Sequence, residues 1–355
     1  MAKKLMKGCE ALGEAAIRAG CKHFFGYPIT PQTEVPEYLS RRLPKIDGVY
    51  VQAESEVAAS NMIYGAAGAG VRVFTSSSSP GISLMAEGLS YIAGAQLPVV
   101  LINIVRGGPG LGGILPAQSD YFQATKAPGH GDFHLLVLAP SSVQEAVDLM
   151  MLAFDLADKY RNPVMVMADG MIGQMMEPVE FKDPPKMDLP PKDWATTGTR
   201  GRRPPNVINS LYLDPLVLEK NSIELRQKYD RMAEEEQRWE LIEPDEPADI
   251  LLVAYGTMAR ICRTSLDLLT EKGIHAALMR PITLFPYPYE PLFEASKKVS
   301  KVLCLEMSMG QMIEDVRLAL RGTQEPDFYG RTGGVVPPPE EVVKAVLRSL
   351  GREEE

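Results

Sequence analysis

The sequence is poor in the residues that build metal centres and disulfide frameworks. Its 355 residues include only four cysteines and four histidines, with no Cys-x-x-Cys pair and no metal-ligand spacing. The cysteines are Cys9, Cys21, Cys262 and Cys304. We expect buried thiols in a reducing compartment, and neither a metal ion nor an iron–sulfur cluster on this chain alone.

Long apolar runs and an excess of basic charge are also missing. The apolar stretches are interrupted by Gly, Pro and Arg and are too short to span a bilayer, and the N-terminal lysines are not followed by the apolar region of a signal peptide. With 37 basic and 46 acidic residues, the formal net charge is −9. This balance argues against a nucleic-acid partner. We therefore expect a cytoplasmic protein that binds neither membranes nor nucleic acids.

Alternating helical and strand-like segments predict an α/β fold. From residue 8 to about residue 170, apolar runs alternate with helical patterns, and the last three runs lack the period-2 alternation of half-exposed strands. This is typical of a parallel sheet that helices cover on both faces. The strands are expected at His23–Gly26, Val49–Val51, Val71–Thr75, Val99–Val105, Leu135–Leu138 and Val164–Ala168.

Proline content divides the chain into three parts. Ten prolines fall between residues 175 and 248, where one charged helix is expected over Leu218–Trp239. From Asp249 the alternation of strands and helices resumes. We predict a first domain at 1–174, a Pro-rich linker with one helix at 175–248, and a second, smaller domain at 249–355.

Two loops after predicted strands hold candidate site residues, because ligands bind at the carboxyl ends of strands in open α/β sheets. Thr30 lies between two prolines in Gly26-Tyr27-Pro28-Ile29-Thr30-Pro31. It serves either as a helix cap or as a ligand-binding hydroxyl. Glu56 begins a helix rich in small residues. It is either a surface residue favoured by the helix dipole or a buried carboxyl group for proton transfer.

Two further loops complete the set. Thr75-Ser76-Ser77-Ser78-Ser79-Pro80-Gly81 offers hydroxyls at a strand end. The loop from Arg106 to Gly113 matches GxGxxG, but no helix pattern and no suitably placed acidic residue follow, so we reject a dinucleotide site. Arg106 itself suits a carboxylate or phosphate ligand, and the alternative is an ion pair with Asp120.

Taken together, these loops resemble the α subunit of the 2-oxoacid:ferredoxin oxidoreductases, which are thiamine-diphosphate enzymes, and among these they resemble the branched-chain type. The resemblance extends into the second part of the chain. It rests on the following segments: Gly26-Tyr27-Pro28-Ile29-Thr30-Pro31, Glu54-Ser55-Glu56-Val57-Ala58-Ala59, Thr75-Ser76-Ser77-Ser78-Ser79-Pro80-Gly81, Arg106-Gly107-Gly108-Pro109, Arg280-Pro281-Ile282-Thr283-Leu284-Phe285-Pro286 and Glu306-Met307-Ser308-Met309-Gly310-Gln311.

The resemblance implies two open, doubly wound sheet domains: a pyrimidine-binding domain and a transketolase C-terminal-like domain. It implies that Glu56 binds N1′ of the aminopyrimidine ring and promotes proton transfer, and that Pro28 contacts the cofactor. Thr30 and Arg106 would bind the oxoacid as catalytic residues. The implied reaction is the oxidative decarboxylation of a 2-oxoacid with CoA, which gives acyl-CoA and CO₂ and passes electrons to ferredoxin.

Departures from the family pattern indicate a divided active site. The Mg²⁺ and diphosphate motif is present only as the partial match Ala168-Asp169-Gly170, and positions 190–200 hold no Asn. The diphosphate-binding β subunit would then supply Mg²⁺, and partner subunits of the ferredoxin-like and γ types would carry [4Fe-4S] clusters. Gly110-Leu111-Gly112 favours 2-oxoisovalerate (3-methyl-2-oxobutanoate) as the substrate. The alternatives are a 2-oxoglutarate enzyme, another thiamine-diphosphate transferase and a non-catalytic scaffold subunit.

Overall fold

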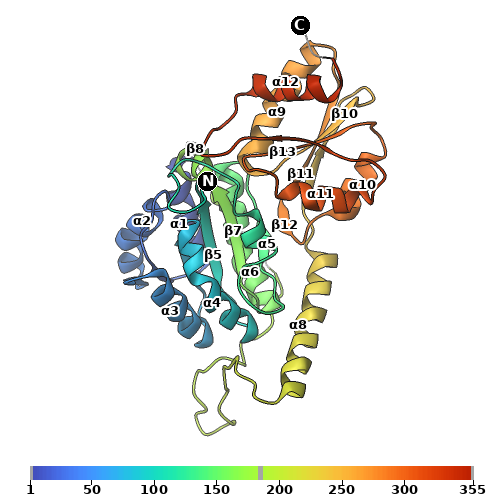
Figure 1. The fold of residues 1–355 in the computed structure, drawn as a ribbon. Helices are drawn as coiled ribbons and strands as arrows, with labels where there is room; N and C mark the ends of the chain where they lie inside the picture. Colours follow the sequence, from blue (N-terminus) through green and yellow to red (C-terminus); the bar gives the residue numbers. More distant parts are fainter. Residues whose placement is uncertain (1–2, 183–186, 353–355) are drawn as a thin grey trace.

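The computed structural model describes residues 3–182 and 187–352, and its larger part is a seven-stranded sheet between two layers of helices (Figure 1). The strand order is β12-β6-β7-β5-β4-β2-β3, and every pairing is parallel except that of β12 with β6. The strands are β2 (His23–Gly26), β3 (Val49–Gln52), β4 (Val73–Ser77), β5 (Val100–Val105), β6 (Leu136–Leu138), β7 (Val164–Asp169) and β12 (Thr283–Phe285).

Helices pack on the sheet in two groups, as right-handed crossovers between parallel strands require. α1 contacts α2 and α6, whereas α3 contacts α4. Every residue of β4, β5 and β7 is buried, which explains the absence of alternation in their sequences. The helices of this part are α1 (Gly8–Arg18), α2 (Glu34–Arg42), α3 (Glu56–Gly68), α4 (Pro80–Gly94), α5 (Tyr121–Thr125), α6 (Val143–Tyr160) and α7 (Gly170–Gln174), with a 3₁₀ turn, η1 (Leu43–Ile46).

The second sheet has five strands in the order β14-β13-β10-β11-β9, and all of its pairings are parallel except that of β9 with β11. Its elements are β9 (Trp239–Ile242), β10 (Ile250–Val253), α9 (Gly256–Glu271), β11 (Ala276–Pro281), α10 (Tyr289–Ser296), β13 (Val302–Glu306), α11 (Met312–Leu320), β14 (Asp327–Gly330) and α12 (Pro339–Ser349). The predicted α/β class with two open sheets is thus confirmed.

The segment between the two sheets contains the single expected helix, α8, over Pro215–Glu235 rather than Leu218–Trp239. The Asp214 side chain accepts a hydrogen bond from the Leu216 N–H and caps the helix start. Besides this helix the segment holds two short strands, because β8 (Met176–Val179) pairs with β1 (Lys4–Lys7) and β9 joins the second sheet. Four-residue strands this short carry little periodicity for a sequence pattern to reveal. Pro184 and Pro185 lie outside the described residues.

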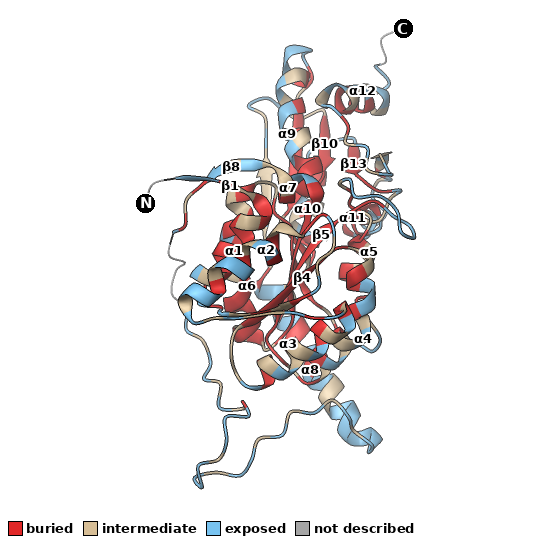
Figure 2. Cartoon of the chain, turned by 90° about the vertical axis from the view of Figure 1, so that its left-hand side faces the viewer, coloured by how far each residue is buried: buried red, intermediate tan, exposed pale blue. Residues whose placement is uncertain are grey.

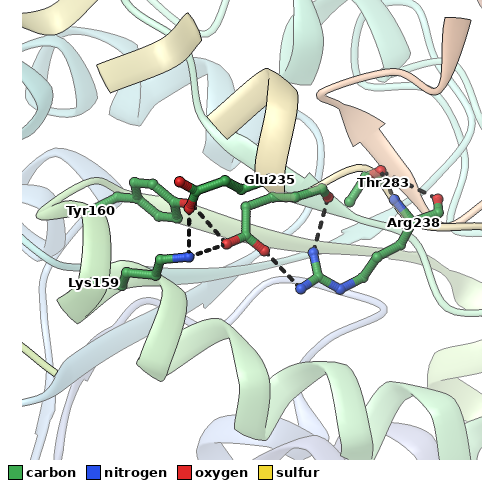
Figure 3. Close-up of polar contacts among 6 residues, drawn as sticks. Lys159, Tyr160, Glu235, Arg238 and Thr283 are labelled. Atoms are coloured by element: carbon green, nitrogen blue, oxygen red, sulfur yellow. Dashed lines mark hydrogen bonds and ion pairs between the residues drawn. The ribbon is translucent and has the colours of Figure 1, made fainter. Parts of the chain in front are cut away.

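The last turn of α8 is held against the first sheet domain by a polar cluster (Figure 3). Lys159 Nζ lies 2.8 Å from carboxylate oxygens of Glu235 and Glu236, and the Tyr160 hydroxyl donates to the same two groups. The Arg238 N–H donates to Thr283 Oγ1 at 2.9 Å, which links this cluster to β12. The first turns of α8 and the extended segment before it are exposed (Figure 2).

One strand of the first sheet comes from the far part of the chain. β12 follows β11 of the second sheet but pairs with β6 of the first, where Thr283 is opposite Leu138 and Phe285 is opposite Val137. The two sheets are therefore joined by backbone hydrogen bonds as well as by side chains. The limits 174/175 and 248/249 stay our proposal for the division of the chain. None of the helices in the described ranges has the length and apolar character that a membrane-spanning helix needs.

Candidate active site at the carboxyl edge of the first sheet

The strand order changes direction between β2 and β4. β3 lies beyond β2 on one side, and the chain then returns to place β4, β5 and β7 on the other side. Such a switch point creates a crevice at the carboxyl ends of the strands, where ligands bind in open α/β sheets. The loops after β2, β3, β4 and β5 all end at this edge, and they hold Thr30, Glu56, the serine run and Arg106.

Arg106 directly follows β5 and is buried, with 7% of its surface exposed. Its Nη1 donates to the Thr30 carbonyl oxygen at 2.8 Å and its Nη2 donates to the Leu111 carbonyl oxygen at 3.3 Å. Its Nε is buried without a hydrogen-bond partner. Among the described residues, no carboxylate lies within ion-pair distance of this guanidinium, so the structure does not support the alternative of an Arg106–Asp120 ion pair.

The glycine-rich loop after Arg106 folds back on itself. The Gly107 N–H donates to the Leu115 carbonyl oxygen at 3.0 Å, and the Gly113 N–H donates to the Gly107 carbonyl oxygen at 2.9 Å. Gly112 has a φ of +59° and an added Cβ would lie 1.9 Å from the Gly107 oxygen, so this turn requires glycine. The next helix, α5, begins only at Tyr121, in agreement with the rejection of a dinucleotide fingerprint.

Thr30 and Pro28 lie in the loop between β2 and α2. Thr30 is exposed and Pro28 is half-buried. α2 begins at Glu34 with Thr33 before it, so Thr30 is not the cap of this helix. Gln32 connects the loop to β4, because its amide donates to the Tyr27 carbonyl oxygen at 3.1 Å and accepts from the Ser76 hydroxyl at 2.6 Å. The loop backbone, and with it the carbonyl group that contacts Arg106, is therefore fixed to the sheet.

Glu56 is the first residue of α3 and is buried, with 4% of its surface exposed. The preceding Ser55 caps the helix by accepting a hydrogen bond from the Ala58 N–H at 3.1 Å. The Glu56 side chain has no hydrogen bond or ion pair to any other residue that the structure describes. A Cβ added to Gly81 would lie 2.5 Å from Glu56 Oε1, so the carboxylate rests on the first turn of α4. Glu56 is thus not the surface residue of the first alternative.

The end of β4 holds buried hydroxyls without partners, and one of them, that of Ser77, lies with the Glu56 carboxylate against Gly81. Thr75 Oγ1, Ser77 Oγ and Ser78 Oγ are buried and make no hydrogen bond within the chain. Ser79 is different, since its hydroxyl accepts from the Arg106 N–H at 3.1 Å. Unsatisfied polar groups are rare in protein interiors and call for an explanation such as a ligand. The start of α4 therefore connects the two candidate residues, Glu56 through Gly81 and Arg106 through Ser79.

A cavity of about 590 Å³ opens beside Arg106, between the two sheet domains. Glu56, Thr30 and Pro28 are not part of its wall. Its lining comprises Ser79, Pro80, Ser83, Arg106, Gly107, Gly108, Pro109, Gly110, Ala117, Ser119, Asp120, Gln123, Met307, Ser308, Met309, Gln311, Thr332 and Gly333. The sequence analysis did not identify Thr332 and Gly333 as site residues. The available signal was the pair of adjacent glycines, Gly333 and Gly334, because glycine favours positive φ values, and the two residues have φ of +67° and +88°.

Asp120 is the one acidic residue in that lining. Its carboxylate accepts from Asn103 Nδ2 at 3.0 Å, and burial raises the pKa of Asp120 above its ordinary value. Arg106 is the one basic residue in the lining. The cavity therefore combines a single fixed positive charge with a neighbouring carboxyl group and mainly small or apolar walls.

Two acidic residues from the resemblance motifs have structural partners. Asp169 caps α7 and accepts from the Thr257 hydroxyl of the second domain at 2.8 Å, and burial raises its pKa. Glu306 is fully buried and accepts three backbone N–H groups at the start of α11. No cluster of His, Cys, Asp and Glu within residues 3–182 and 187–352 is arranged to hold a metal ion.

Comparison with known proteins first defines the class. Residues 14–243 match the family described as pyruvate flavodoxin/ferredoxin oxidoreductase, thiamine-diphosphate-binding, and residues 248–342 match pyruvate:ferredoxin oxidoreductase core domain II. A 2-oxoglutarate:ferredoxin oxidoreductase from Magnetococcus marinus superimposes with a TM-score of 0.88 at 26% identity, covering 98% of this chain and 65% of that one. A split-gene transketolase, at 15% identity and a TM-score of 0.62, shares the fold.

Sequence relatives then identify the family. A ketoisovalerate oxidoreductase subunit, VorB, from Methanothermobacter thermautotrophicus is 47% identical over 94% of each chain. A 2-oxoglutarate synthase subunit, KorA, from the same organism is 33% identical over 97% of this chain and 98% of its own. The chain belongs to the 2-oxoacid:ferredoxin oxidoreductase family, and it is a subunit of such an oxidoreductase. The resemblance and the enzyme class expected from the motifs are thereby confirmed.

Proposed function

We propose that this chain supplies the pyrimidine-binding half of a thiamine-diphosphate active site that decarboxylates a branched-chain 2-oxoacid, such as 3-methyl-2-oxobutanoate. The products are an acyl-CoA and CO₂, and ferredoxin accepts the electrons. The observation that carries the proposal is Arg106, a buried guanidinium without an acidic partner at the topological switch point.

A buried charge is costly unless it is paired, so the environment of Arg106 favours an anionic ligand. The two carbonyl contacts fix the plane of the guanidinium and leave Nε and further N–H groups available. A planar fork of donors matches a carboxylate in two parallel hydrogen bonds. Arg106 therefore binds the carboxylate of the 2-oxoacid, and Thr30, whose backbone carbonyl contacts Arg106, would contribute its hydroxyl to the substrate.

The residues around Glu56 fit the aminopyrimidine ring of thiamine diphosphate. A buried carboxyl group with no partner can share a proton with a ring nitrogen, and the free hydroxyls of Ser77 and Ser78 offer further polar contacts. Pro28, in the neighbouring loop, would contact the same ring. When bound, the cofactor supplies the nucleophilic carbon and the electron sink for decarboxylation. Glu56 holds or gives a proton at the ring nitrogen N1′.

The lining of the cavity favours a monocarboxylic substrate. A second carboxylate, as in 2-oxoglutarate, would meet Asp120 and no second cation among the lining residues. The branched alkyl group of 3-methyl-2-oxobutanoate instead meets apolar atoms such as those of Pro80, Ala117 and Met307. Like charges brought together in a confined site disfavour the wrong ligand. The similarity to the ketoisovalerate subunit VorB, higher than that to KorA, supports the same choice.

The proposal assigns the remaining chemistry to partner subunits. A diphosphate-binding β subunit would hold Mg²⁺ and the diphosphate, because Asp169 is already engaged as a helix cap and in a contact with Thr257. Subunits of the γ and ferredoxin-like types would carry the [4Fe-4S] clusters and complete the CoA site. The relatives support this arrangement, since they are named as subunits.

The test uses the assembled complex with Arg106→Ala. Truncating one partner of a buried, hydrogen-bonded charge pair costs about 2–5 kcal/mol, which corresponds to roughly a 30- to 5,000-fold loss in affinity. We expect the KM for 3-methyl-2-oxobutanoate to rise by this factor while the KM for CoA stays unchanged. An oxoacid KM within about twofold of the wild-type value would assign Arg106 to structure alone.

The parallel test replaces Glu56 by Gln and uses Glu54→Gln as its control. Glu54 lies two residues earlier and is exposed, so the two variants make the same change in charge. Positioned proton transfer contributes about 10²–10⁴-fold to rate, and we expect Glu56→Gln to lower oxoacid-dependent ferredoxin reduction at least tenfold. If both variants reduce ferredoxin at the wild-type rate, a scaffold role for this chain replaces the catalytic one. A panel of 3-methyl-2-oxobutanoate, 2-oxoglutarate and pyruvate identifies the substrate.

A further inference from the structure

α4 packs against the start of α3 at two of its glycines, Gly81 and Gly88. A Cβ added to Gly81 would lie 2.0 Å from Ser77 Oγ and 2.5 Å from Glu56 Oε1. A Cβ added to Gly88 would lie 2.4 Å from Ser60 Oγ and 2.6 Å from Ser60 Cβ. At Gly88 a methyl group would meet Ser60 Cβ, which cannot rotate away, so a larger residue there would push α4 away from α3. At Gly81 a methyl group would displace the Glu56 carboxylate and the Ser77 hydroxyl.

The contacts are regularly spaced on both helices. Gly81 and Gly88 lie seven residues apart on α4, and Glu56 and Ser60 lie four apart on α3, so each pair shares one face of its helix. Alanine forms helix better than glycine does, and a helical glycine without a packing reason is therefore disfavoured. Gly65 of α3 shows the contrast, because it is exposed and an added Cβ would meet no atom within 4 Å.

We propose that Gly81 and Gly88 are positioning residues that set the place of the Glu56 carboxylate. The proposal rests on the function proposed above for Glu56. It goes further, because it states that α4, the helix that faces Glu56, determines the position of this carboxylate.

The position of the Glu56 side chain is determined by packing rather than by hydrogen bonds. Within the described part of the chain no donor binds its carboxylate, and the nearby Ser77 hydroxyl is also without a partner. A carboxylate that no hydrogen bond orients takes its position from the atoms it touches, and these include the first turn of α4 at Gly81. A shift of α4 by a few tenths of an ångström would therefore move the carboxylate or release it to other rotamers.

The experiment compares Gly88→Ala with Gly65→Ala in the assembled complex. Gly88 lies away from the proposed site, so its substitution acts only through the spacing of the two helices. We expect Gly88→Ala to weaken thiamine-diphosphate binding about tenfold, measured by calorimetric titration of the cofactor-free complex, and Gly65→Ala to bind like the wild type. Binding of the cofactor by Gly88→Ala within twofold of wild type overturns the proposal.

A compensating substitution separates helix spacing from general damage. Ser60→Gly removes the atoms that the new methyl group would meet, so Gly88→Ala with Ser60→Gly is expected to restore the wild-type Kd within about threefold. If Gly88→Ala alone does not assemble, this double variant decides the matter, because its failure to assemble or to bind the cofactor also overturns the proposal.

A thermodynamic cycle links the effect to Glu56. If Gly88 acts through Glu56, the tenfold loss in cofactor affinity disappears when Gly88→Ala is introduced into the Glu56→Gln background, because the two changes remove the same contact. Additive losses would mean that Gly88 acts on the structure at large, against the proposal. A wild-type cofactor Kd and wild-type turnover for Glu56→Gln itself would instead refute the function proposed for Glu56.

Discussion

Replacing Glu306 by Gln tests whether this motif residue stabilises the second domain rather than taking part in catalysis. Its carboxylate accepts the N–H groups of Gln311, Met312 and Ile313 at 3.1, 2.9 and 3.0 Å, and the Ser308 hydroxyl at 2.9 Å. These donors include the free N–H groups at the start of α11, where the helix dipole also favours a negative charge. Glutamine keeps the size but turns one acceptor into a donor that faces other donors.

The size of the effect follows from these contacts. Hydrogen bonds to a charged group contribute about 1.5–3 kcal/mol each, and the variant loses about half of them together with the charge. We expect Glu306→Gln to lower the free energy of unfolding by about 3–6 kcal/mol, measured by urea denaturation of the full chain with an unchanged m-value. Glu314→Gln is the control, because Glu314 is exposed in the first turn of the same helix. A difference below about 1 kcal/mol between the two variants would refute the reasoning.

Two further predictions concern buried charges. Burial lowers the pKa of Lys228 to about 7, so between pH 7 and about 10.5 the folded chain holds a neutral amine while the unfolded chain is protonated, and stability rises with pH across this window. Lys228→Met, but not the exposed Lys220→Met, should abolish this rise, which amounts to at most about 5 kcal/mol in pH-dependent unfolding curves. Asp315 accepts from the Tyr121 and Tyr289 hydroxyls at 2.6 and 2.5 Å. Asp315 also accepts from Lys126 Nζ at 2.6 Å. Asp315→Asn should therefore lower the free energy of unfolding by about 3–5 kcal/mol in thermal unfolding, and a smaller loss would show that neutral amide contacts replace the carboxylate.

Sequence periodicity predicted the main helices and strands because each buries a continuous apolar face. β2 has its expected bounds, and β3 and β7 begin at their expected first residues, Val49 and Val164. The short strands β8, β9 and β12 were missed, since three or four residues paired at a sheet edge leave no recognisable period. Their formation depends on partners that are distant in the sequence.

The candidate site likewise has features that the sequence predicts and features that depend on tertiary contacts. The position of the loops after the strands was sufficient to predict that Thr30 and Arg106 lie at one edge of the sheet. In the structure the Arg106 guanidinium donates a hydrogen bond to the Thr30 carbonyl oxygen. The spacing of residues could not show that Glu56 lies against Gly81, because that contact depends on how two helices cross. Nor could it show that the wall of the cavity beside Arg106 includes Thr332, since this contact requires the relative placement of both domains.

The crossing of β12 into the first sheet has a consequence for anyone who divides this protein for study. A fragment ending before residue 249 would lack Thr283–Phe285 and leave the backbone groups of β6 unpaired along an apolar border. Such borders recruit strands from other molecules. The truncated piece would therefore tend to self-associate during expression, whereas a version that carries the 283–285 segment on a short tether should remain monodisperse.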